Sequence, residues 1–65
     1  MIDIDELSKK IIYYRAINKM TVTDLADKMN ISPSTLRKIT QKNNSVKETT
    51  LVYVWNFLET LESED

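Results

Sequence analysis

Apolar side chains recur along most of the chain at spacings of three and four residues, the period of an amphipathic helix. The first such segment covers about residues 3–17, with acidic residues in its first turn, where they complement the helix dipole. Its apolar face consists of Ile4, Leu7, Ile11 and Tyr14. No alternating pattern typical of strands competes with this period. The pattern therefore predicts an all-α protein.

A second helix is predicted over residues 22–29, where Val22, Leu25, Ala26 and Met29 stand at i, i+3, i+4 and i+7. Thr21 precedes it as N-cap, and Asp24 follows three residues later as a variant of the capping box. Asn30 comes directly after this helix. Because the chain has no glycine, asparagine is the residue best able to adopt the left-handed conformation that ends a helix. We expect the same of Asn18, Asn43 and Asn44.

The third predicted helix, residues 33–40, has an apolar back and a polar front. Ser32 is its N-cap, and Pro33 takes the first helical position, where a missing N–H costs nothing. Leu36 and Ile39 point to one side. The opposite stripe presents hydrogen-bond donors, on Ser34, Arg37, Lys38 and Gln41.

Residues 41–45 are polar and predict a loop. Ser45 and Glu48 then form a second S-x-x-E capping box, which predicts a fourth helix over residues 46–61. Its core face is expected to comprise Leu51, Val54, Trp55, Leu58 and Leu61, whereas Val52, Tyr53 and Phe57 fall outside that arc. Residues 62–65 should fray. The whole chain, residues 1–65, is expected to be one compact four-helix domain.

Composition argues against catalysis and cofactors. The chain has no His, Cys or Gly, which removes the usual general base, the usual zinc ligands and glycine-rich phosphate loops. We therefore expect no enzyme, metal site or cofactor, and no small-molecule ligand is evident. No apolar run approaches the ~18 residues of a membrane span, and the acidic N-terminus is unlike a signal peptide. A cytoplasmic protein without a membrane partner is expected.

The net charge of −1 hides an uneven distribution. Residues 1–8 carry three acids and no base, and residues 48–65 carry five acids and no base. All nine bases lie between them, against two acids. Such asymmetry hints at a face that binds a polyanion, although lysines spread over a solvated surface would give the same count.

The middle of the chain forms a recognisable unit, because an eight-residue helix, a short turn and a second short helix with a polar front make a helix-turn-helix. Ala26 is small where the two helices would cross, and Ile31 would fill the angle between them. Leu36 and Ile39 would anchor the second helix, so that its front projects outward. A helix of this kind fits the major groove of B-DNA, which is about 12 Å wide.

Residues 21–39, TVTDLADKMNISPSTLRKI, resemble the helix-turn-helix of the lambda-repressor-like or Cro-type domains. The resemblance extends over about residues 7–58, because the first and fourth predicted helices also keep the family's spacing. The matching positions are Ile11, Tyr14, Arg15, Thr21, Leu25, Ala26, Ile31, Ser32, Thr35, Leu36, Ile39, Thr50, Leu51, Val54 and Leu58. The chain departs from the family at Val22, Asn30 and Pro33, and it lacks the usual fifth helix.

The resemblance implies a sequence-specific DNA-binding transcriptional regulator, a repressor of bacterial or phage type, with double-stranded DNA as its partner. Base edges would be read by Ser34, Arg37 and Lys38. Phosphates would be held by Thr21, Thr23, Ser32, Thr35, Gln41, Lys42, Asn43 and Asn44, with charge added by Lys19 and Lys28. The plainer alternatives are N-capping for Thr21 and Ser32 and a solvated face for Arg37 and Lys38. Arg15 is expected to brace the fold by pairing with Asp24 or Glu48.

Apolar residues in excess of the core suggest a second partner. They lie on the first predicted helix, at Ile12, Tyr13 and Ile17, and on the fourth. Because one short domain makes few base contacts, we expect a homodimer with Val52, Tyr53 and Phe57 in its interface. The alternative is a protein-interaction module, such as an antirepressor, that uses the same fold without binding DNA.

Overall fold

The computed structural model describes residues 1–63, which form α1 (Ile4–Asn18), α2 (Val22–Met29), α3 (Pro33–Thr40) and α4 (Glu48–Glu62), with no strand in that part of the chain. The predictions of an all-α fold and of four helices are confirmed. Each helix lies within two residues of its expected bounds. Glu62 ends α4 and Ser63 caps it, whereas the fraying expected of residues 64–65 lies outside the described residues. None of the four helices has the length and apolar character needed to cross a membrane.

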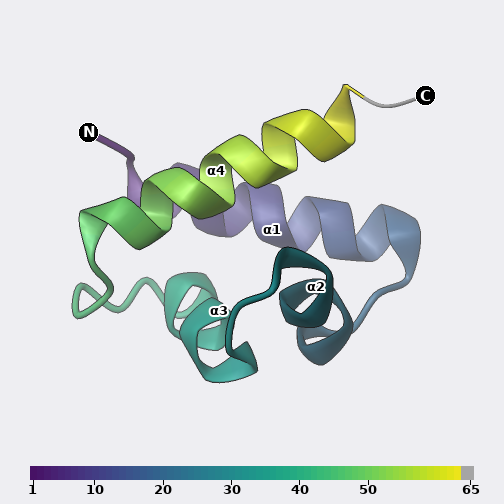
Figure 1. The fold of residues 1–65 in the computed structure, drawn as a ribbon, viewed down its shortest axis with the longest axis horizontal. Coiled ribbons are helices and arrows are strands. Elements are labelled where there is room, and N and C mark those ends of the chain that lie inside the picture. Colours follow the sequence, from purple (N-terminus) through teal and green to yellow (C-terminus); the bar gives the residue numbers. More distant parts are fainter. Residues whose placement is uncertain (64–65) are drawn as a thin grey trace.

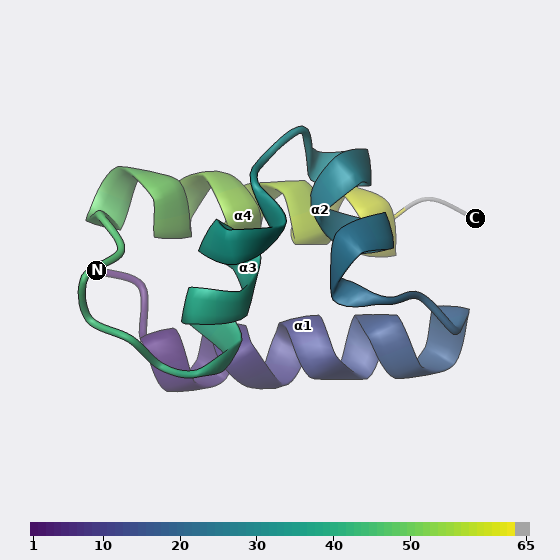
Figure 2. The ribbon, with the colours of Figure 1, turned by 90° about the horizontal axis from the view of Figure 1, so that it is seen from below.

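The helices form two layers. The long helices α1 and α4 pack against each other and run in the same direction (Figure 1). The short helices α2 and α3 lie together on one side of this pair, and α3 packs against both α1 and α2 (Figure 2). The helix-turn-helix therefore occupies its own face of the molecule.

The core lies between the two layers and draws on every predicted apolar face. Its buried side chains are Leu7, Ile11, Leu25, Ala26, Met29, Leu36, Ile39, Leu51, Val54 and Leu58. Trp55 and Leu61, expected in the core, are only partly buried against it. Phe57, expected outside the core arc, is buried to a similar degree and packs on the same cluster. The excess of apolar surface on α4 is thus smaller than the helical pattern predicts.

Two predicted helix starts form as expected. The Thr21 hydroxyl accepts from the backbone N–H of Asp24 at 3.0 Å, and the Asp24 carboxylate accepts from the backbone N–H of Thr21 at 3.2 Å. This completes the capping box of α2. At the start of α3 the Ser32 hydroxyl accepts from the backbone N–H of Ser34 at 3.2 Å, and Pro33 occupies the first helical turn. Both starts are therefore fixed by local sequence.

The predicted capping box at Ser45 is wrong. α4 begins two residues later than expected, with Lys47 as an N-cap whose side chain makes no capping hydrogen bond. The side-chain oxygen of Asn43 instead accepts from the backbone N–H of Ser45 at 2.9 Å, an Asx turn that holds Ser45 in the loop. The Glu48 carboxylate accepts from the backbone N–H of Ile2 at 2.8 Å. Each half of the predicted box is used elsewhere.

Asparagine provides only one of the three left-handed residues. Asn30 has φ 62° and ends α2 as predicted, but the other two positive φ angles among the described residues belong to Lys19 (53°) and Lys42 (59°). The predictions for Asn18, Asn43 and Asn44 are therefore wrong. Asn18 stays helical, and its side-chain amide donates to the carbonyl of Tyr14 at 2.9 Å. The side chain of Asn43 forms an Asx turn, and the left-handed residue is the preceding Lys42.

Candidate nucleic-acid interface

The orientation of α3 is set by its buried back. Leu36 and Ile39 are fully buried, and α3 packs against α1 and α2. Ala26 is also fully buried in the facing helix, as expected where two helices cross closely. In the turn between them, the backbone N–H of Ile31 donates to the carbonyl of Ala26 at 3.0 Å. The front of α3 consequently faces away from the core, and Figure 2 shows α3 and α2 in front of the α1–α4 pair.

All three residues predicted to read bases lie on that front and are exposed. Ser34 is in the first turn of α3, and Arg37 and Lys38 are in the last turn. Within residues 1–63, neither Arg37 nor Lys38 takes part in an ion pair. Two cations and one hydroxyl therefore share a surface where no carboxylate of the described part of the chain pairs with them.

Several of the predicted phosphate contacts lie at the starts of α2 and α3, and the two starts differ in how well they suit an anion. Thr21, Thr23 and Ser32 are exposed, whereas Thr35 is half-buried. A capping hydroxyl that accepts a backbone N–H keeps its own proton as a donor, so capping and phosphate binding are compatible. Asp24, however, places a carboxylate at the start of α2, whereas the first turn of α3 contains no acid. The start of α3 is thus the better place for an anion.

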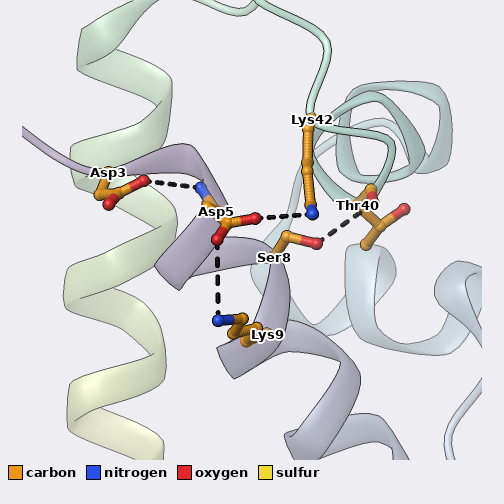
Figure 3. Close-up of polar contacts among 6 residues, drawn as sticks. All are labelled: Asp3, Asp5, Ser8, Lys9, Thr40 and Lys42. Atoms are coloured by element: carbon orange, nitrogen blue, oxygen red, sulfur yellow. Dashed lines mark hydrogen bonds and ion pairs between the residues drawn. The ribbon is translucent and has the colours of Figure 1, made fainter.

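The loop after α3 presents Gln41, Lys42, Asn43 and Asn44, all exposed. Lys42 is the exception among these predicted phosphate contacts, because its ammonium lies 2.6 Å from the carboxylate of Asp5 (Figure 3). The other oxygen of Asp5 lies 3.7 Å from Lys9, which stands one turn further along α1. The adjacent Ser8 hydroxyl donates to the carbonyl of Thr40 at 3.2 Å. The start of α1 therefore contacts the end of α3 and the first residues of the loop.

The Asp5–Lys42 pair changes both ionisations. The hydrogen bond and charge of Lys42 lower the pKa of the Asp5 carboxyl, and Lys9 adds a smaller effect in the same direction. The same contact raises the pKa of the Lys42 ammonium. Asp5 therefore competes with a phosphate for the Lys42 ammonium. Helical periodicity does not relate positions 5 and 42, so only the folded chain reveals this contact.

Arg15 braces the fold, but not through an acid. Its Nε donates to the carbonyl of Met20 at 3.2 Å, across the turn that ends α1. The expected pairing with Asp24 or Glu48 is wrong, since no ion pair within residues 1–63 includes Arg15. The left-handed Lys19 reverses the chain and brings the Met20 carbonyl within reach of the guanidinium.

Folding sorts the charges by layer. Residues 19–47, which contain α2 and α3, carry six bases and two acids, whereas residues 48–63, which contain α4, carry three acids and no base. Residues 1–18 carry three of each. On the α1–α4 side, Lys10 pairs with Glu62 at 2.7 Å and lies 5.0 Å from the ring centre of Trp55. Positive charge outside ion pairs is consequently concentrated around the helix-turn-helix.

The predicted dimer residues are partly occupied within the chain. The Tyr53 hydroxyl donates to the carbonyl of Met29 at 2.7 Å and so binds the end of α2. Its ring lies 6.0 Å from that of Phe57, which is half-buried. Val52 is 38% exposed and Tyr53 44% exposed. The contact from Tyr53 to Met29 was not foreseen, because a phenol gives no indication in the sequence of which carbonyl it will reach.

No protein-family model, curated protein or solved structure matches this chain. Function is therefore inferred from the chain's own side chains and their arrangement.

Proposed function

We propose that the chain is a DNA-binding transcriptional regulator that places α3 in the major groove and represses by occupying an operator. The observation that carries this proposal is the exposed front of α3, whose two cations pair with no carboxylate among residues 1–63 and whose back is fixed in the core. A helix held in this way enters a groove about 12 Å wide without rearrangement of the domain.

The residues of α3 suit two kinds of contact. Arg37 can donate two parallel hydrogen bonds to O6 and N7 of guanine, and Lys38 and Ser34 can donate to neighbouring acceptors. The start of α3, with Ser32 and the adjacent backbone N–H groups, suits a phosphate because no acid lies in its first turn. These roles agree with those implied by the resemblance to lambda-repressor-like domains.

The sorting of charge by layer supports the same orientation. The basic helix-turn-helix attracts the DNA backbone, whereas the acidic α4 disfavours the reverse approach. Net charge alone, at −1, would not favour DNA binding. A repressor of this kind works in the bacterial cytoplasm, where it excludes polymerase from the DNA that it covers.

A second candidate function is a protein-interaction module of the antirepressor type. The observation that favours it is the set of exposed apolar side chains Ile12, Tyr13 and Ile17 on α1. In that case α3 would be a solvated face and DNA would not bind.

The test is a titration of backbone amide NMR shifts with an arbitrary duplex of about 20 base pairs, at low and at moderate salt. Non-specific binding in this class has a Kd of about 10⁻⁴–10⁻⁶ M and weakens steeply with salt, so no operator sequence is needed. We expect salt-sensitive shifts centred on residues 32–44. A folded protein whose shifts do not move at low salt would contradict DNA binding and favour the interaction module.

A further inference from the structure

Ser8 is the one polar side chain that is buried in the described part of the chain, at 1% exposed. It lies in the second turn of α1. A serine within a helix often donates to a carbonyl one turn earlier in the same helix. The Ser8 hydroxyl instead donates at 3.2 Å to the carbonyl of Thr40, the last residue of α3 (Figure 3). Because an alanine would fill almost the same space, what the hydroxyl adds is this hydrogen bond.

The end of α3 depends on the bond from Ser8. The last four carbonyls of a helix have no partner within that helix. In α3 the carbonyls of residues 37–39 accept from the backbone N–H groups of residues 41–43, at 2.9–3.0 Å. Thr40 has the remaining carbonyl, and the donor that reaches it within residues 1–63 is the Ser8 hydroxyl. The last turn of α3 is therefore joined to α1 by a hydrogen bond that the loop does not supply.

A second contact joins the same two regions, but it is of a different kind. Asp5 precedes Ser8 on α1 and pairs with Lys42 at 2.6 Å, where solvent reaches both side chains. Salt screens such a pair, and a phosphate competes with Asp5 for the ammonium. The bond from Ser8 to Thr40 is uncharged and partly buried. An anion that approaches the loop therefore disturbs the contact of Asp5 and not that of Ser8.

The turn that Ser8 holds carries both cations of the α3 front. Arg37 and Lys38 lie in the last turn of α3, and the Thr40 hydroxyl donates to the carbonyl of Arg37 at 2.7 Å. Hydrogen bonds to base edges are directional and require donors placed to within about 0.5 Å. Attraction to phosphates is less demanding, because it acts over the Debye length of ~8–10 Å. A displaced last turn would consequently impair base reading more than attraction to the DNA backbone.

We propose that Ser8 is a positioning residue for base reading, whose hydrogen bond to Thr40 fixes the last turn of α3 so that Arg37 and Lys38 meet base edges. This inference rests on the proposed function, because it gives Ser8 a part in sequence-specific DNA binding. Ser8 itself touches no DNA, since it is buried where α1 packs against α3. Its loss should lower the ratio of specific to non-specific affinity.

The test measures that ratio for the wild type and for Ser8→Ala. One duplex is selected from a random library by the wild-type protein, the other has an arbitrary sequence, and fluorescence anisotropy gives both affinities at one salt concentration. We expect S8A to lower the ratio at least ~10-fold, while its non-specific affinity changes less than ~2-fold. Asp5→Asn is the matched control on the same side of α1, and it should change both affinities by the same factor. A folded S8A with the wild-type ratio would overturn the inference.

A loss of stability alone would not lower the ratio, because unfolded molecules bind neither duplex and both affinities fall together. Val54→Ala is the control for this effect, since it removes part of a buried side chain from α4. If V54A lowered the ratio as much as S8A does, reduced stability would explain the result and the inference would be overturned. Ser8→Cys is the second variant, because its thiol fills the site but is only a weak donor. If S8A does not fold, a wild-type ratio in S8C overturns the inference.

Amide hydrogen exchange without DNA separates this inference from the proposed function. In S8A the amides of residues 41–43, which bond to the last turn of α3, should exchange at least ~10-fold faster than in the wild type, beyond any change in the amides of α4. Wild-type exchange rates at residues 41–43 in a folded S8A would overturn the inference even if the wild type binds DNA. Faster exchange in S8A, combined with a wild type that selects no DNA sequence, would instead contradict the proposed function and leave the contact between Ser8 and α3 standing.

Discussion

Two neighbouring stretches, the front of α3 and the loop that follows it, present cations that look alike in the sequence but differ in the folded chain. Arg37 and Lys38 are exposed and take part in no ion pair within residues 1–63. Lys42, only four residues further on, lies 2.6 Å from Asp5. The difference teaches that helical spacing sets which way a basic side chain points, whereas its availability for a ligand depends on residues far away in the sequence.

The largest effect is expected from removing the support of the α3 front. Leu36→Ala leaves a cavity behind a fully buried side chain and should lower the free energy of unfolding by about 2–5 kcal/mol. A small domain has little stability in reserve, so α3 should lose its fixed orientation at moderate denaturant. Urea unfolding followed by circular dichroism measures this. The exposed Val52→Ala is the control, with an expected change below about 1 kcal/mol. An equal decrease in the free energy of unfolding in both variants would contradict the burial of Leu36 in the core.

The next largest effect separates the two stretches directly. Arg37→Ala should weaken non-specific DNA binding ~3–10-fold at low salt and reduce the slope of log K against log salt by about 0.9, as expected for one lost cation in a complex that makes no base-specific contacts. Lys42→Ala removes the same charge, but from an ammonium already held by Asp5, so its effect should be smaller. Fluorescence anisotropy at several salt concentrations measures both. If Lys42→Ala lost more DNA affinity than Arg37→Ala, the loop and not the front of α3 would supply the more important cation.

The front of α3 could be predicted from the sequence because every contact that positions it is local or periodic. Ser32 and Pro33 start the helix, and Leu36 and Ile39 bury its back. The same is true of the capping box at Thr21 and of the left-handed Asn30. Such features depend on residues within one or two helical turns, where propensity and spacing decide the outcome.

The surroundings of Lys42 could not be predicted in this way. Asp5 approaches it from the other end of the chain, and Glu48 binds the backbone of Ile2 instead of completing a capping box. Arg15 donates to the carbonyl of Met20 instead of pairing with an acid. In each case several partners of suitable chemistry were present in the sequence, and the packing of α1 against α3 and α4 selected one of them.

A smaller effect of opposite sign should follow from freeing Lys42. Asp5→Asn removes the carboxylate that competes with phosphate for this ammonium, so non-specific DNA binding should tighten ~2–5-fold at low salt, with a steeper salt dependence. Asp27→Asn is the matched control, because it removes the same charge from an exposed residue of α2 that is in no ion pair within residues 1–63. If both variants bind DNA more tightly by the same factor, the change in net charge explains the result and Asp5 does not restrain Lys42.

The smallest effect concerns stability and pH. Because Lys42 and Lys9 lower the pKa of Asp5 in the folded chain, the pair stabilises the fold above the carboxyl's unfolded pKa, near 4. This contribution disappears as the pH falls through the lowered pKa. The raised pKa of Lys42 has the converse effect: its contribution is complete below the unfolded pKa of about 10.5 and disappears as the pH rises through the raised value.

We therefore expect Asp5→Asn to have a slightly lower urea midpoint than the wild type at pH 6 and the same midpoint near pH 2. High salt should shrink the difference at pH 6, since both side chains are reached by solvent. A midpoint difference that persisted at pH 2 would mean that Asp5 stabilises the fold by means other than its charge.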